Sequence, residues 1–269
     1  MMKYLMTKRW IGTLPVLSLM FIVPIINSCS LGGSYTIENR SDFVYITRVS
    51  DTKCAATSNG YVTSNFISSL QYGDCYLMGY ILSNNRDANG FFVAEESTLV
   101  NDAPLRRFAV YDRNTMIEDT GYNVYEIDDF GVFSFDSYLY YGDNWHFKVV
   151  SKYNFENTDV RMRLAYDRNN QFDRTGSDVS GTNKVILDII IEAKEGISPI
   201  PNSKLYDVAV NMNNLRMMYT PNFSGAIVSG DLEYVNVLVQ LRYKHNGKDE
   251  YMGNWDGLDS SFYLSFVKE

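Results

Sequence analysis

The sequence predicts an all-β protein. From Tyr35 onward, short segments alternate apolar and polar side chains and are separated by clusters of Gly, Asn and Asp. A period of two is typical of strands with one buried face, and almost no segment keeps a convincing helical period. Strands at this spacing, without helices between them, indicate barrels or sandwiches.

The clearest strand covers residues 235–244, where apolar side chains occupy every second position. Asn246-Gly247 follows at once, and a second short strand begins after it. Asn-Gly favours a type I′ turn because both central residues of that turn need a positive φ. The sequence therefore predicts a β-hairpin at this point.

Other segments follow the same pattern. Residues 185–191 are largely β-branched, which predicts a central strand buried on both faces. In the strand expected at 161–166, Arg161 and Arg163 would point outward. Residues 64–71 fit either a single helical turn or a loop. Further strands are expected at 76–83, 91–94 and 146–152.

The N-terminus has the three parts of a secretory signal. Basic residues occur within the first nine positions, an apolar stretch covers residues 10–26, and Ile26-Asn27-Ser28-Cys29 ends it. This ending resembles the lipobox of Gram-negative lipoproteins, which implies cleavage after residue 28 and acylation of Cys29. Two or more acyl chains hold a protein stably at a membrane. A retained membrane-spanning anchor is the alternative interpretation.

Residues 29–34 are uncharged and rich in Gly and Ser, so we expect a flexible lipidated tether. No acidic run follows Cys29, which favours the periplasmic face of the outer membrane over the cell surface. Removing the signal peptide, residues 1–28, leaves 241 residues and changes the formal charge from −8 to −11, because the leader carries three basic residues and no acidic ones. This acidic balance argues against nucleic acid as a partner.

Two cysteines, Cys54 and Cys75, follow the lipidation site. An exported compartment permits a disulfide between them, which would add about 3 kcal/mol in the chain-entropy model. Two separate buried thiols are the alternative, since free cysteine behaves as a small apolar residue. The sequence leaves both open.

The composition changes near residue 119, after a stretch rich in Arg and Asp, and this predicts a boundary between two β domains. The order of motifs resembles the NigD-like lipoproteins of gut anaerobes. The segments that carry this resemblance, beside the lipobox, are 73–82, 137–140, 187–192, 205–210 and 235–247.

The resemblance implies an OB-like barrel at 35–118 and an immunoglobulin-like antiparallel β-sandwich at 119–269. The family has no established activity, and its name comes from a proposed bacteriocin-immunity role of one branch. The chain departs from the family pattern by lacking an acidic run after the lipid cysteine and by carrying Cys54 and Cys75.

The sequence offers no catalytic constellation. His146 and His245 fall on strand patterns, and we expect both to face solvent without a catalytic or metal-binding partner. Carboxylate pairs suited to a glycosidase are easy to find among 32 acidic residues, and solvated turns explain them equally well. Residues 167–173 loosely match a calcium loop but lack its central Gly and closing Glu, so a polar turn is expected.

Aromatic residues cluster around Gly142-Asp143, and these are the candidate binding residues: Tyr138, Tyr140, Tyr141 and Trp145. Aromatic rings at strand ends can stack on sugar or protein surfaces. Burial in a sandwich core is the alternative, because strand alternation turns half of such rings inward.

These observations predict a non-enzymatic lipoprotein without cofactor or metal, anchored in the outer membrane through Cys29. A protein or glycan in the cell envelope would be its partner, with an immunity or defence role as one sub-case. Two alternatives remain open: a lipid-anchored polysaccharide hydrolase, and a structural subunit of a surface assembly.

Overall fold

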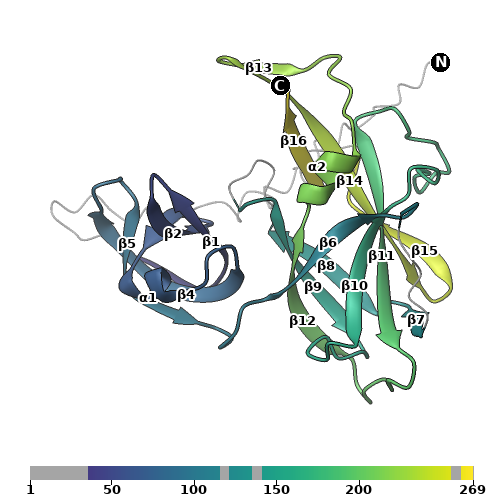
Figure 1. Ribbon diagram of the computed structural model, residues 1–269, viewed down its shortest axis with the longest axis horizontal. Coiled ribbons are helices and arrows are strands. Elements are labelled where there is room, and N and C mark those ends of the chain that lie inside the picture. Colours follow the sequence, from purple (N-terminus) through teal and green to yellow (C-terminus); the bar gives the residue numbers. More distant parts are fainter. Residues whose placement is uncertain (1–35, 116–120, 135–140, 256–261, 269) are drawn as a thin grey trace, which may run out of the picture. The chain divides into compact units, whose positions relative to one another are not determined.

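The computed structural model describes residues 36–115, 121–134, 141–255 and 262–268 (Figure 1). Most of these residues lie in β-strands, and the two helices found among them are short: α1 (Asn65–Ser69) and α2 (Asn213–Met218). The predicted all-β class is confirmed. In this part of the chain, neither helix has the length and apolar character needed to cross a bilayer.

The first five strands close into a barrel. They are β1 (Ile37–Val49), β2 (Thr52–Thr57), β3 (Gly60–Thr63), β4 (Cys75–Arg86) and β5 (Phe92–Leu99). Their order around the barrel is β1-β2-β3-β5-β4, with β3 and β5 parallel and α1 between β3 and β4 in the chain. A five-stranded closed sheet of this kind is OB-like, as predicted.

The short helix α1 covers one end of the barrel core. Ser64 caps it, because its side-chain oxygen accepts a hydrogen bond from the backbone N–H of Ile67 at 3.1 Å. Ile67 is fully buried and joins a cluster that includes Val44, Ile46 and Met78. Of the two interpretations of residues 64–71, the helical turn is therefore the one observed.

The remaining strands form one eleven-stranded sheet, in the order β13-β14-β11-β10-β6-β12-β9-β8, with β15 and β16 paired to β14 and β7 paired to β11. Their bounds are β6 (Arg106–Asp112), β7 (Tyr122–Tyr125), β8 (Asp129–Ser134), β9 (Asn144–Ser151), β10 (Val160–Tyr166), β11 (Lys184–Lys194), β12 (Lys204–Asn211), β13 (Ile227–Ser229), β14 (Leu232–His245), β15 (Lys248–Met252) and β16 (Phe262–Val267).

Strand β6 joins two layers of this sheet. Its first half, residues 106–109, pairs with β12, and its second half, residues 110–112, pairs with β10. The main core lies between the layers and includes Trp145 and Phe147 from β9 together with Leu164 and Leu187 from β10 and β11. A large apolar core between two β layers agrees with the predicted sandwich.

The sandwich is mixed rather than antiparallel throughout. The pairs β6–β10, β6–β12 and β11–β14 are parallel, whereas the sequence predicted an antiparallel sandwich. Period-two alternation marks which residues share a face, and it carries no information about the direction of the neighbouring strand.

The boundary between barrel and sandwich falls earlier than predicted. The barrel ends with β5 at Leu99, and β6 already belongs to the larger sheet, so the transition lies in residues 100–105 rather than after residue 118. The Arg- and Asp-rich stretch that suggested the later boundary is largely β6 itself, because Arg106, Arg107 and Asp112 all belong to this strand.

The predicted hairpin is confirmed. Strands β14 and β15 pair through His245 and Lys248, and the two residues between them, Asn246 and Gly247, have φ of 50° and 74°. Both values are in the left-handed region that a type I′ turn requires. This turn fixes the register that places the charged residues of β14 beside those of β15.

Candidate functional site

Strand register places five residues in one row across the outer face of the sheet. The pairs Tyr251↔Arg242, Arg242↔Asp188, Asp188↔Ala165 and Ala165↔Tyr111 link β15, β14, β11, β10 and β6. Directly paired residues project to the same face of a sheet. We call these five residues the charged row, after Arg242 and Asp188 at its centre.

The next row along the same strands faces the core. Leu241, Leu187 and Tyr166 are paired neighbours on β14, β11 and β10, and they are 0%, 0% and 6% exposed. The sheet is therefore apolar on its inner side and charged on its outer side. The inner row explains why these strands form, and the outer row has to be explained by something other than core packing.

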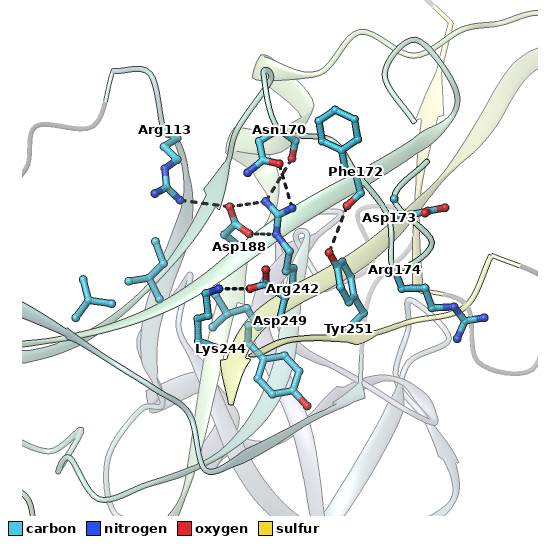
Figure 2. Close-up of a pocket in the computed structure, with 15 residues that line it drawn as sticks. Arg113, Asn170, Phe172, Asp173, Arg174, Asp188, Arg242, Lys244, Asp249 and Tyr251 are labelled. Carbon is cyan, nitrogen blue, oxygen red and sulfur yellow. Dashed lines mark hydrogen bonds and ion pairs between the residues drawn. The ribbon is translucent and has the colours of Figure 1, made fainter. Parts of the chain in front are cut away.

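The ion pair between Arg242 and Asp188 is the centre of the row (Figure 2). Nε of Arg242 lies 2.5 Å from Oδ1 of Asp188, and Nη2 lies 3.0 Å from Oδ2, which makes the contact bidentate. Asn170 contributes its side-chain and backbone oxygens to the same guanidinium, each at 3.3 Å. Burial by itself lowers the pKa of Arg242, but the bond to Asp188 outweighs it and raises the pKa above its usual value.

Further side chains surround this pair (Figure 2). Nη1 of Arg113 reaches Oδ2 of Asp188 at 3.3 Å, and Nζ of Lys244 pairs with Asp249 at 2.8 Å. Together with Phe172, which is 44% exposed, they line a groove with a volume of about 650 Å³. This volume is in the range of small-ligand sites, about 300–1,000 Å³.

The turn at 167–173 borders the groove and is stabilised by its own carboxylates. Oδ1 of Asp167 accepts the backbone N–H of Asn169 at 3.0 Å, and Oδ1 of Asp173 accepts from Thr175 and Ser177. The hydrogen bond from the Thr175 hydroxyl is the main reason why the pKa of Asp173 is lowered. A polar turn is thus observed, and the described residues contain no group of three or more His, Cys, Asp or Glu that could hold a metal ion.

The groove combines polar and aromatic side chains. Guanidinium groups, amides and aromatic rings lie on one surface, where they can hydrogen-bond a polar ligand and pack against its apolar faces. The carboxylate of Asp188 accepts hydrogen bonds from two arginines, which leaves it poorly placed to act as a general acid or base.

The predicted aromatic cluster is not at the surface. Trp145 is fully buried, with its ring centroid 6.4 Å from that of Phe147, and Tyr141 is 8% exposed and packs against Phe43 at 5.6 Å. Both therefore serve the core, and the prediction of a binding role is wrong for them. Tyr138 and Tyr140 lie outside the described residues, as does Cys29.

The two cysteines are separate buried thiols. Cys54 on β2 pairs with Thr47 of β1, whereas Cys75 on β4 pairs with Tyr45 on the other side of β1. Two strands that flank a third lie about 10 Å apart, beyond the Cα separation of about 7 Å that a disulfide tolerates. Burial raises the pKa of Cys54 to about 11 and that of Cys75 to about 12.

Both histidines have a hydrogen-bond partner within the protein. His146 is 5% exposed, its Nε2 lies 2.8 Å from Oδ1 of Asp207, and its ring stacks on Phe43. Nδ1 of His245 lies 2.9 Å from the carbonyl oxygen of Ile127. The expectation of exposure is wrong for His146 because the outward face of β9 is covered there.

Only weak signals in the sequence point to the charged row. Asp188 is the single charge within the apolar run 185–191, and an acidic residue inside a central strand calls for a cationic partner. That partner, Arg242, is 54 residues away in the chain. Only the parallel pairing of β11 with β14 brings the two together.

The fold has counterparts among solved structures. An uncharacterized protein from Parabacteroides merdae matches with a TM-score of 0.50 and 14% identity, over 85% of this chain and 99% of that chain. A candidate lipoprotein from Bacteroides fragilis matches with a TM-score of 0.44 and 10% identity, over 87% of this chain and 97% of that one. No family model matches the sequence, and no curated protein matches it. At this level of identity the first likeness concerns the fold alone.

Proposed function

We propose that this chain is a lipid-anchored outer-membrane protein, on the periplasmic face, that binds a protein or glycan partner without turning it over. The leader supports the anchor, because a basic start and an apolar stretch end at Ile26-Asn27-Ser28-Cys29. Membership of the NigD-like family is part of this proposal. The order of leader, OB-like barrel and sandwich supports it, and an immunity role would be one form of the binding function.

The observation that carries the binding function is the arrangement around Asp188. Its carboxylate is bonded to Arg242 and Arg113, in a groove that also presents Tyr251 and the exposed ring of Phe172. A glycosidase needs two carboxylates free to exchange a proton or attack a sugar. A carboxylate held by two guanidinium groups instead orients them for hydrogen bonding to a ligand.

The anchor is tested with the full chain expressed in a Gram-negative host. Cys29→Ser is compared with wild type by membrane fractionation and by mass spectrometry of the mature N-terminus. We expect an acylated Cys29 and membrane retention in wild type, and an unmodified chain in the soluble envelope fraction for the variant. Cys54→Ser serves as the control that leaves acylation unchanged. A variant that stays membrane-bound, or an unmodified wild-type N-terminus, would refute the anchor.

Binding is separated from hydrolysis by incubating the purified full chain with envelope and plant polysaccharides. Retention of a polysaccharide without release of shorter products supports the proposal. Product release that is abolished by Asp188→Asn would overturn it in favour of the hydrolase. Loss of retention in Arg113→Gln, with Arg40→Gln as control, would place binding at the groove, since Arg40 is a highly exposed arginine on the barrel.

A further inference from the structure

A second groove opens where β6 leaves β10. The two strands pair at Val110↔Leu164 and run together through Asp112↔Tyr166, but residues 106–109 turn to β12 instead. The outer face is therefore open between the first half of β6 and the first half of β10. The groove there has a volume of about 470 Å³.

Arginines dominate the lining of this groove. Its charged members are Arg106, Arg107, Arg161, Arg163 and Asp112. With Glu192, which is bonded to two of these arginines, the cluster has four cations and two anions and a formal charge of +2, in a chain whose net charge is −8. A local concentration of positive charge on a protein with negative net charge attracts anionic ligands to that surface. We call this surface the arginine groove.

Two of the arginines are held as a fixed pair. Nε of Arg161 and Nε of Arg163 both contact Oε2 of Glu192, at 2.6 and 2.9 Å. The ring of Tyr122 lies below Arg161, with its centroid 3.9 Å from Cζ. A carboxylate shared between two guanidinium groups, with a ring against one of them, keeps both planar groups in one orientation.

The other two arginines have carbonyl partners. Arg106 donates to the carbonyl oxygens of Phe155, Asn157 and Thr158, and Arg107 donates to that of Gly73 at 2.6 Å. Among the described residues no carboxylate lies within ion-pair distance of either guanidinium. Burial lowers the pKa of Arg106, which shows that its charge is disfavoured by its surroundings. A carboxylate placed beside it would offset that cost.

An aromatic ring completes the groove. Tyr111 is 44% exposed, and its ring centroid lies 5.8 Å from Cζ of Arg163. A sugar ring presents an apolar face that packs on an aromatic ring, and a uronic acid adds a planar carboxylate that a guanidinium binds with two hydrogen bonds. We propose that the arginine groove binds a carboxylate-bearing glycan, with Tyr111 against a sugar ring and the arginines on its carboxylates.

This inference goes beyond the proposed function, because it names a second groove and a ligand class and does not depend on the anchor. If Cys29→Ser released the protein from the membrane, glycan binding in solution would be unaffected. Failure of glycan binding would in turn leave the anchor untouched. The two outcomes are therefore distinguishable.

Calorimetric titration of the full chain, purified in detergent, tests the proposal. The probes are a galacturonic acid oligosaccharide and the same oligosaccharide with methyl-esterified carboxylates, which keeps the sugar rings and removes the charge. We expect the acid to bind at least about tenfold more tightly than the ester, and to weaken as salt is raised. Equal affinity for acid and ester, or no binding of either, would overturn the proposal.

Variants assign the binding to the groove. Arg107→Gln and Tyr111→Ala should each weaken binding of the acid by about tenfold, the size expected for loss of one charge-assisted contact or one packed ring. Arg40→Gln and Tyr111→Phe are matched controls that should bind like wild type, and circular dichroism confirms folding of each variant. Equal losses in Arg40→Gln and Arg107→Gln would contradict the assignment. Tighter binding of polyglutamate than of the oligosaccharide would refute the glycan as ligand.

Discussion

The two faces of the sheet formed by β6, β10, β11 and β14 differ in character: one carries apolar side chains and the other carries charged ones. The inner face carries Leu187 and Leu241, both fully buried, and the outer face carries Asp188 and Arg242, which pair at 2.5 Å. Burying apolar surface drives folding, whereas a buried ion pair contributes little net stability. The comparison indicates that the inner face maintains the fold, and it leaves the outer face available for the recognition role proposed above.

The largest effect is expected on the inner side of the core. Trp145→Ala removes the largest fully buried side chain and should lower the free energy of unfolding by about 3–5 kcal/mol. Urea denaturation followed by circular dichroism measures it. The more conservative Trp145→Phe should recover part of the loss. A stable Trp145→Ala protein with weaker ligand binding would instead return Trp145 to a binding role.

The second test acts on the outer face. Asp188→Asn leaves the mostly buried guanidinium of Arg242 without its carboxylate, and breaking such a pair costs about 3 kcal/mol or more. Replacing both partners, as Asp188→Leu with Arg242→Met, should restore most of that stability. Retention of polysaccharide by the groove beside Asp188 should nevertheless be lost. Denaturant midpoints and calorimetry on the same samples separate the two effects. A double variant as unstable as the single one would show that the pair is needed for the fold.

A smaller effect concerns the barrel, where both cysteines are buried on the outer side of the sheet, next in sequence to Ala55 and Tyr76 of the barrel core. Their pKa values are raised to about 11 and 12, so the thiols stay protonated in the folded state while the unfolded chain ionises near its ordinary pKa. Stability is therefore unaffected below about pH 8.5 and falls as the pH rises toward 11, by up to about 1.4 kcal/mol per pH unit for each thiol.

Thermal unfolding between pH 7 and pH 10 measures this loss, and Cys54→Ala with Cys75→Ala should reduce its slope. Intact mass with and without alkylation reports the state of the thiols. Two unlabelled thiols in the native protein that become alkylated on unfolding are expected. A disulfide that must be reduced before labelling would contradict the barrel geometry.

Local patterns in the sequence were sufficient for much of the fold. The hairpin at Asn246-Gly247 follows from backbone sterics, and the strand at 185–191 follows from its β-branched residues, because both signals are contained in a few neighbouring positions. The predicted boundary between the two domains, after residue 118, was wrong because β6 already belongs to the sandwich and crosses from one of its layers to the other. That crossing depends on its parallel partners β10 and β12, which no local pattern encodes.

The candidate sites were harder to predict for the same reason. Alternation alone cannot say which face of a strand is covered, so Trp145 was equally suited to the surface and to the core. Asp188 and Arg242, or Arg161 and Glu192, meet only through strand register between distant segments. The arginine groove could not be predicted from the acidic composition, because a net charge of −8 is a sum over the whole chain and does not report local clusters of positive charge.

Hydroxyl-radical footprinting of the full chain, with and without saturating galacturonic acid oligosaccharide, tests most directly that the outer face of the sandwich is the recognition surface. Tyr111 and Tyr72 are 44% and 55% exposed, so they should be oxidised at similar rates in the free protein. We expect the ligand to slow oxidation of Tyr111 several-fold and to leave Tyr72, on the barrel, unchanged. Protection of Tyr72 with no change at Tyr111 would contradict the account.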